Sequence, residues 1–350
     1  MHAKNIQASA PGKLILLGEY AVLEQAPCLV SAVQRKCTVD IEPEDSPWFS
    51  IRSSREEVPN VKCRLAAGGS FRFKEGLSDD GRKRLRFVLS TIKHALNQVD
   101  DALGGASVFI NTDRFFHQPS EQKLGLGASA AITVSLLAAL MKFSGQRLTE
   151  QELYRQAFQI HWKAQGGLGS GMDIAASATG GVIEYQMRPD KAAGGLIKSV
   201  DWPDSLRMIS IWAGHSASTQ NMVQQVQIFR DANPNRYDAI MQPMKELSEA
   251  GCKAFKTGNT EEFLEIVGEY VALEQQLGEA SKAEIISEVH QNIGDLISRA
   301  GGSYKPSGAG GGDIGVAFCQ GDEACYEVKE AIEKSRFDLL DLPLQTGEPA

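Results

Sequence analysis

The sequence has no long basic tract, no internal repeat and no apolar run of membrane-spanning length. Its 36 lysines and arginines stand against 44 aspartates and glutamates, which gives a formal net charge of −8. The densest basic cluster is only three residues long, Arg82-Lys83-Arg84. This balance argues against nucleic acid or an anionic membrane surface as the main partner, so we expect neither.

The six cysteines include no C-x-x-C pair and no histidine cluster with the spacing of a zinc site. We therefore expect free thiols in a reducing compartment. Residues 1–9 lack a basic segment followed by an apolar one, which is the pattern of a signal peptide. The longest apolar run, near 130–141, is too short to cross a bilayer. The interpretation is a cytoplasmic protein.

With 350 residues and 42% hydrophobic content, the chain is long enough for two domains. Strand and helix patterns are mixed without regular alternation, which favours an α+β fold over a doubly wound sheet. The polar, small-residue stretch 188–203 is the best candidate for the junction. We therefore predict an N-terminal domain over 1–195 and a C-terminal domain over 196–350.

Periodicity predicts the individual elements. Helices are expected at 85–100, 132–141, 150–163, 237–256, 260–277, 283–300 and 323–334, and a further one begins near 221. Strands are expected at 14–17, 28–40, 48–52, 70–73, 107–111, 182–185, 206–212, 314–318 and 337–340. The Thr149-Glu150-Gln151-Glu152 sequence is a capping-box pattern at one helix start.

A glycine-bearing turn that runs directly into an alanine-rich helix is the main chemical signal. Its sequence is Lys123-Leu124-Gly125-Leu126-Gly127-Ala128-Ser129-Ala130-Ala131. A tight turn at a helix N-terminus leaves backbone N–H groups unpaired, with the positive end of the helix dipole behind them, and so suits a phosphate. Taken alone, the same pattern also fits an ordinary loop before a core helix.

Three side chains near glycines are candidates for phosphoryl transfer. Ser129 can reach a metal ion, and Asp173 can orient or deprotonate a hydroxyl. Lys13, at the head of an apolar strand, can stabilise charge on a phosphate. Helix capping for the serine and the aspartate, and a surface position for the lysine, are the competing interpretations.

Two further glycine stretches support a ligand site. The segment 165–173 follows a predicted helix, and the run of glycines within 308–312 comes directly before an apolar strand. A flexible linker does not explain that position, whereas close backbone contact with a ligand does. His161, on the helix before the second stretch, is more simply a partly buried helical histidine than a ligand.

Together these stretches resemble the three motifs of the GHMP kinase superfamily, in the family's order. The motifs are Ala10-Pro11-Gly12-Lys13 through Gly18-Glu19-Tyr20, then Gly125 to Ala131, then Lys305-Pro306-Ser307-Gly308-Ala309-Gly310-Gly311-Gly312-Asp313. Within the superfamily the phosphomevalonate kinase branch is the best match. It is indicated by Tyr20 in the first motif, Lys123 before the second, and the segments around His161 to Asp173 and Ser216 to Thr219.

The resemblance implies a ribosomal-S5-like N-terminal domain and a ferredoxin-like C-terminal domain with the site between them. It implies ATP with Mg²⁺ and phosphorylation of (R)-5-phosphomevalonate to (R)-5-diphosphomevalonate, in the mevalonate pathway of isoprenoid synthesis. Lys13 and Asp173 would be the catalytic pair and Ser129 the metal ligand. Nucleotide contacts would come from Lys123, Gly125, Leu126, Gly127, Ala128, Ser129 and Ala130. Acceptor contacts would come from Glu19, Tyr20, Lys123, Ser170, Gly171, Ser218, Thr219, Ser307, Gly308, Ala309 and Gly310.

Two departures from the family pattern affect the predicted site. Ala128 stands where the family often has a serine, and the acidic metal ligand of mevalonate kinases has no counterpart, with His161 near that position. The alternatives are another GHMP small-molecule kinase, acting on mevalonate or a sugar phosphate, and a non-catalytic sensor of ATP or a metabolite. The sequence leaves the oligomeric state open, a homodimer included.

Overall fold

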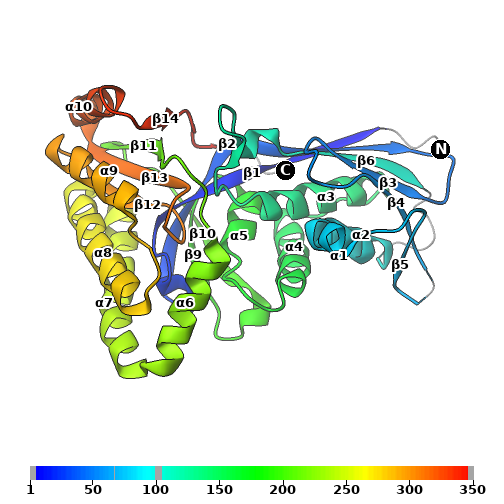
Figure 1. The fold of residues 1–350 in the computed structure, drawn as a ribbon, viewed down its shortest axis with the longest axis horizontal. Helices are drawn as coiled ribbons and strands as arrows, with labels where there is room; N and C mark the ends of the chain where they lie inside the picture. The colour runs from blue at the N-terminus through cyan, green and yellow to red at the C-terminus, as the bar shows by residue number, and fades with distance from the viewer. Residues whose placement is uncertain (1–4, 67, 99–104, 346–350) are drawn as a thin grey trace.

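The computed structural model describes residues 5–66, 68–98 and 105–345. Its strands form two main sheets, with helices packed on both, so the predicted α+β class is confirmed (Figure 1). The eight-stranded sheet follows the order β10-β9-β2-β6-β3-β4-β5, with β1 paired to β2. Its strands are β1 (Ile6–Leu17), β2 (Pro27–Pro43), β3 (Phe49–Ser53), β4 (Val61–Leu65), β5 (Phe71–Phe73), β6 (Ala106–Asn111), β9 (Val182–Met187) and β10 (Gly195–Val200).

The first strand is three times longer than predicted. Only 14–17 reads as a continuous apolar run, but β1 begins at Ile6 and pairs antiparallel with β2 as far as Leu17. Its first half alternates small buried residues, Ala8 and Ala10, with more exposed polar ones. Small residues weaken a hydrophobicity signal although they keep the period of two. The strand carries Lys13 from the sheet into the interior, where it is 5% exposed.

Helices α3 (Ala128–Phe143) and α5 (Met172–Thr179) pack on β1 and β2, and the glycine turns lead into them. Helices α2 (Arg86–Leu96) and α4 (Glu150–Ala164) pack against α3, and a short helix α1 (Asp79–Arg84) precedes them. The capping box at Thr149 is confirmed, since the Thr149 hydroxyl accepts from the Glu152 N–H and the Glu152 carboxylate accepts from the Thr149 N–H. The helix predicted at 85–100 corresponds to α2, and its predicted end at Asp100 lies outside the described residues.

The second sheet has the order β12-β13-β11-β14. Its strands are β11 (Leu206–Trp212), β12 (Ser303–Pro306), β13 (Ile314–Gln320) and β14 (Asp338–Leu340). Helices α9 (Glu288–Arg299) and α10 (Gly321–Glu333) pack with it, while α6 (Thr219–Ala232), α7 (Pro234–Thr257) and α8 (Thr260–Ser281) form a layer beside both sheets (Figure 1). Short segments complete the fold: β7 (Phe116–His117), β8 (Gln122–Lys123), η1 (Ala21–Glu24), η2 (Asp113–Phe115) and η3 (Lys191–Ala193).

Local structure differs from the predictions at three places. The stretch 188–203, predicted as the domain junction, contains β10, which pairs antiparallel with β9. The chain passes from the first sheet to the second through 201–205. Helix α9 begins at Glu288 instead of 283, and β12 was missed because it lies at the edge of a glycine-rich stretch. For β10 and β12 a partner strand outweighs the local composition.

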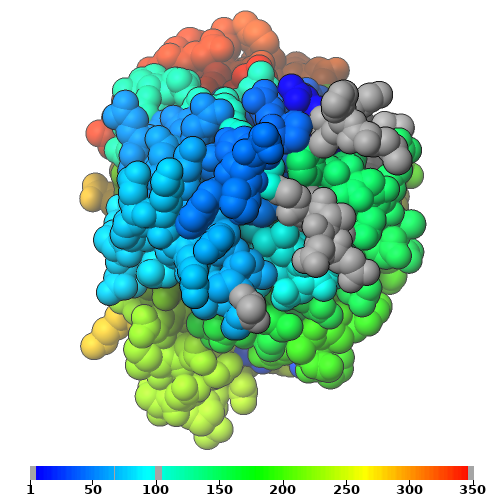
Figure 2. Space-filling model, turned by 90° about the vertical axis from the view of Figure 1, so that its right-hand side faces the viewer, coloured from blue at the N-terminus to red at the C-terminus, as the bar shows by residue number. Residues whose placement is uncertain are grey.

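The end view shows how the two parts share the surface. Residues of the first strands and of α1 and α2, coloured blue to cyan, cover the left and centre of the face, green residues cover its right side, and the yellow-green α6–α7 region projects below (Figure 2). Among the described residues, no helix combines the length and the hydropathy needed to cross a bilayer.

Candidate active site

A cavity of about 390 Å³ lies where the three glycine stretches meet. Its lining comes from β1, η1, α3, α5, the start of α6 and the turn between β12 and β13, so both sheets contribute. The predicted residues that line it are Lys13, Glu19, Tyr20, Lys123, Gly125, Leu126, Gly127, Ala128, Ser129, Ser170, Gly171, Asp173, Thr219, Ser307, Gly308 and Ala309. Ala130, Ser218 and Gly310 are not among the lining residues.

The turn before α3 has the backbone geometry of an anion site. Gly125 (φ +70°) and Gly127 (φ +74°) both adopt the left-handed conformation, and Gly127 is the N-cap of the 16-residue helix. The first N–H groups of such a helix have no intrahelical partner and point outward with the positive end of the dipole. Ser129 is the second helical residue and lines the cavity, whereas the buried Ala130 lies behind it. We call residues 123–129 the phosphate loop.

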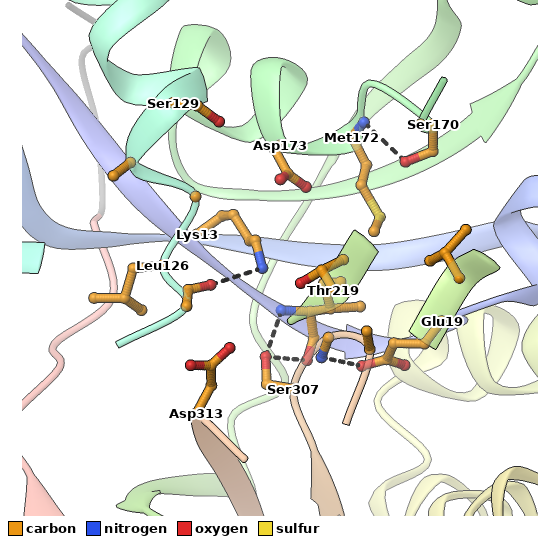
Figure 3. Close-up of a pocket in the computed structure, with 18 of the residues that line it drawn as sticks. Lys13, Glu19, Leu126, Ser129, Ser170, Met172, Asp173, Thr219, Ser307 and Asp313 are labelled. Atoms are coloured by element: carbon orange, nitrogen blue, oxygen red, sulfur yellow. Dashed lines mark hydrogen bonds between the residues drawn. The ribbon is translucent and has the colours of Figure 1, made fainter. Parts of the chain in front are cut away.

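Lys13 and Asp173 approach the phosphate loop from different elements, β1 and the first turn of α5. A Cβ built on Gly127 would lie 3.3 Å from Lys13 Cγ and 3.6 Å from Asp173 Oδ2, so glycine is what allows the three to converge. The Lys13 ammonium donates to the Gly125 carbonyl at 3.2 Å. Among the described residues no ion pair joins Lys13 to Asp173. Figure 3 shows both side chains extending into the same space.

His161 is a partner of Ser129. Its Nε2 lies 3.1 Å from the Ser129 hydroxyl, and its ring stacks on Phe87 at a centroid distance of 4.5 Å. Burial lowers the pKa of His161 to about 4, so the ring is neutral near pH 7 and has one donor and one acceptor nitrogen. It therefore fixes the serine hydroxyl beside the helix N-terminus.

A buried charge cluster joins the segment that follows β1 to the third glycine stretch. Glu19 Oε1 binds the ammonium of Lys305 and accepts from the Gly308 N–H at 3.2 Å. Glu19 Oε2 is buried and has no hydrogen-bond partner. Glu274 of α8 is also fully buried with both carboxylate oxygens unpartnered, and burial raises its pKa, with Glu19 adding to that effect and Lys305 opposing it.

Several predicted acceptor residues have structural partners. The Ser307 hydroxyl accepts from the Ile15 N–H at 2.8 Å and donates to the Ile15 carbonyl at 3.0 Å, so it ties the third stretch to β1. The Tyr20 hydroxyl donates to the Ala309 carbonyl at 2.6 Å. The exposed Ser218 caps α6 by accepting from the Asn221 N–H at 3.4 Å.

Two small residues, Ser170 and Gly171, line the cavity, and a third, Gly310, lies behind it. Gly171 caps α5 at φ +82°, where a Cβ would lie 2.4 Å from the Phe158 ring. Ser170 lines the cavity and its hydroxyl accepts from the Met172 N–H at 3.4 Å. Gly310 packs against the Ile285 carbonyl at the back of its loop, where a Cβ would lie 2.1 Å away.

Sequence reasoning did not select Asp313, although it ends the third stretch. Its carboxylate lines the cavity against the phosphate loop, since a Cβ on Gly125 would lie 2.5 Å from Asp313 Oδ2. Burial raises the pKa of Asp313 to about 6. The signal in the sequence that could have identified Asp313 was a carboxylate residue directly after three glycines. Its positive φ of +59° is visible only in the structure.

No cluster of three or more histidine, cysteine or acidic side chains suited to a metal occurs in the part of the chain that the structure describes. An all-protein metal cage is therefore not the chemistry of this cavity. Magnesium that accompanies a nucleotide commonly takes only one or two protein ligands with phosphates and water. The Ser129 hydroxyl at the mouth of the phosphate loop fits that pattern.

Comparisons with known proteins find relatives that are similar along most of the chain. Residues 87–181, from α2 past α5, match the family described as "GHMP kinases N terminal domain". A phosphomevalonate kinase of Streptomyces sp. (strain CL190) is 26% identical, with 97% of each chain covered. A mevalonate kinase of Pyrococcus abyssi is also 26% identical, over 94% of this chain and 92% of its own.

Solved structures share the fold along nearly the whole chain. The Lin0012 protein of Listeria innocua has a TM-score of 0.84 at 25% identity, covering 98% of both chains. Streptococcus pneumoniae phosphomevalonate kinase in complex with phosphomevalonate and AMPPNP has a TM-score of 0.75 at 21% identity, covering 97% of this chain and 100% of that one. The chain is thus similar in sequence to mevalonate and phosphomevalonate kinases along nearly its whole length, and residues 87–181 match the GHMP kinase N-terminal family model.

Proposed function

We propose that this kinase transfers the terminal phosphoryl group of ATP to the phosphate of (R)-5-phosphomevalonate. One observation carries the proposal: a lysine, a carboxylate and a phosphate loop converge at Gly127. Phosphoryl transfer depends mainly on positioning and on charge stabilisation, and these three groups supply both.

The nucleotide phosphates would lie against the N–H groups of the phosphate loop, with Ser129 as the protein ligand of Mg²⁺. When bound, the nucleotide would supply the phosphoryl group and the metal would neutralise part of its charge. Lys13, held by the Gly125 carbonyl, steadies negative charge at the loop. His161 keeps the Ser129 hydroxyl in place.

Asp173 is proposed to orient the acceptor oxygen. A phosphate acceptor is already anionic near neutral pH, since its second pKa is about 6, so a strong base is not required. The unpartnered Glu19 Oε2 offers an acceptor to a substrate hydroxyl. The exposed Lys123 at the cavity edge supplies a cation for the acceptor's phosphate.

Support for a phosphorylated acceptor comes from the exposed Lys123 at the cavity edge, and from the relatives named phosphomevalonate kinase. Other relatives of similar identity are named mevalonate kinase, so mevalonate is the second candidate acceptor.

The deciding experiment compares initial rates of ADP release with phosphomevalonate and with mevalonate at equal concentration. The proposal expects at least about a tenfold higher kcat/KM for phosphomevalonate, as one charge-assisted contact to the extra phosphate would give. A preference for mevalonate would contradict the proposed acceptor. Binding of phosphomevalonate and Mg-ATP without ADP release would contradict the kinase function.

A further inference from the structure

The loop 214–218, between β11 and α6, forms one edge of the cavity. Ser216 and Ala217 line it, and so do Thr219 and Val223 on the first turns of α6. Most of this loop is exposed. Two side chains from other parts of the chain, those of Asp313 and Gln122, hold its backbone.

Asp313 holds the loop from the side of the second sheet. Its Oδ1 accepts from the Ala217 N–H at 3.3 Å, and its own N–H donates to the His215 carbonyl at 2.8 Å. The His215 ring closes the same contact, with Nε2 2.8 Å from the Gly311 carbonyl. The loop is thereby fastened to the third glycine stretch.

Gln122 holds the loop from the side of the first sheet. Its Oε1 accepts from the Ser216 N–H at 2.9 Å and lies 3.4 Å from the Ser216 hydroxyl. Gln122 belongs to β8, immediately before the phosphate loop. Adjacent N–H groups of one loop are thus bound by side chains from the two halves of the chain.

Asp313 adopts an uncommon backbone conformation. It has φ +59°, a region where non-glycine residues are uncommon and where aspartate and asparagine are the tolerated exceptions. A carboxylate beside an anion site is also electrostatically costly. Three groups offset the cost: Lys13 from β1, Lys123 from β8 and His215 from the loop.

We propose that Asp313 and Gln122 are positioning residues that fasten loop 214–218 to the phosphate loop and so set the affinity for the acceptor. The acceptor-side edge, Ser216, Ala217 and Thr219, is then ordered before the acceptor binds, which lowers the entropic cost of binding. The nucleotide depends on the phosphate loop itself, so its affinity is largely independent of the fastening. The inference rests on the proposed kinase function for the acceptor's identity only.

The test uses Asp313→Gly and Gln122→Met, with Gln118→Met as the matched control. Glycine removes the carboxylate at a backbone angle that it adopts freely, and methionine removes the amide at similar size. Gln118 is exposed, lies four residues from Gln122 and does not line the cavity. Each fastening variant should raise the acceptor KM about threefold to tenfold with the ATP KM within about twofold, because a side-chain hydrogen bond to the loop backbone is lost.

Amide hydrogen exchange of residues 214–219 provides a readout that needs no substrate. Both fastening variants should exchange about tenfold faster there than Gln118→Met, and Asp313→Asn, which keeps an acceptor oxygen, should restore protection. Unchanged exchange in both variants, or an equal rise of the ATP and acceptor KM values, would overturn the inference. If the wild-type chain phosphorylates neither acceptor, the proposed function fails while the exchange result still decides the fastening.

Discussion

Lys13 and Asp173 reach the same point of the phosphate loop from two elements that are 160 residues apart in the sequence. Neither side chain needs the other for its place, since Lys13 is held by the Gly125 carbonyl and Asp173 by the first turn of α5. Each can therefore be removed with limited effect on the other. Single substitutions at these positions are accordingly informative about chemistry.

Lys13→Met and Asp173→Asn should each lower kcat at least about a hundredfold while changing the ATP KM far less, because Lys13 is proposed to stabilise charge on the phosphates and Asp173 to orient the acceptor oxygen. Steady-state kinetics with varied ATP measures both constants. Asp201→Asn, at an exposed position outside the cavity, is the control. Near-normal turnover in either variant would exclude that residue from the mechanism.

The contribution of the hydrogen bond between Ser129 and His161 can be measured as a coupling energy in a double-mutant cycle. His161→Phe keeps a flat ring against Phe87 but loses the bond at 3.1 Å, and should lower kcat/KM for ATP about threefold to tenfold. In a Ser129→Ala background the same change should have little further effect. Additive losses would show that His161 acts independently of the serine.

At the scale of elements, α3 has a left-handed glycine at each end. Gly127 caps its start, where a Cβ would approach Lys13, and Gly145 follows its end at φ +82° with open space around it. The same substitution at the two ends therefore separates backbone strain from crowding of the site.

Gly127→Ala and Gly145→Ala should each lower the free energy of unfolding by about 1–2 kcal/mol, the cost of alanine in the left-handed region. Only Gly127→Ala should also raise the ATP KM severalfold, because its methyl group displaces Lys13 from the phosphate loop. Denaturant unfolding and kinetics measure the two effects. Equal ATP KM values in the two variants would argue against the assigned loop.

At the scale of the whole molecule, Glu274, Lys305 and Glu19 join α8, β12 and the end of β1 in one buried cluster. The hydroxyls of Tyr270 and Tyr20 lie in the same region, and the former donates to the Glu19 carbonyl at 2.6 Å. A buried cluster with unpartnered carboxylate oxygens is costly when every acid is ionised. Its protonation therefore affects global stability.

Because burial raises the pKa of Glu274 above its ordinary value of 4.5, the folded chain binds this proton more tightly than the unfolded chain. The free energy of unfolding should then fall as the pH rises above 4.5, by up to about 1.4 kcal/mol per pH unit until the folded-state pKa is reached. Glu274→Gln should flatten that decline. Exposed Glu279→Gln on the same helix is the control, and identical pH profiles for the two variants would refute the assignment.

The reach of sequence reasoning differed between the elements and the site. Long amphipathic helices such as α7 and α8, and the capping box of α4, were predictable because their signals are local. Strands β10 and β12 were not, since polar or glycine-rich segments become strands only through their partners β9 and β13. The three glycine stretches indicated a ligand site through their local pattern alone, because each combines unusual backbone freedom with an adjoining helix or strand.

The sequence by itself determined the chemical inventory: a glycine turn at a helix start, a lysine, a carboxylate and a small hydroxyl, in the order of a known kinase family. Only the tertiary structure decided how these groups are used. It commits the Ser307 hydroxyl to Ile15, 292 residues away, pairs Ser129 with His161 and brings Asp313 against Gly125. Local patterns reveal which groups can form hydrogen bonds, but the partner of a buried group is chosen by packing across the whole chain.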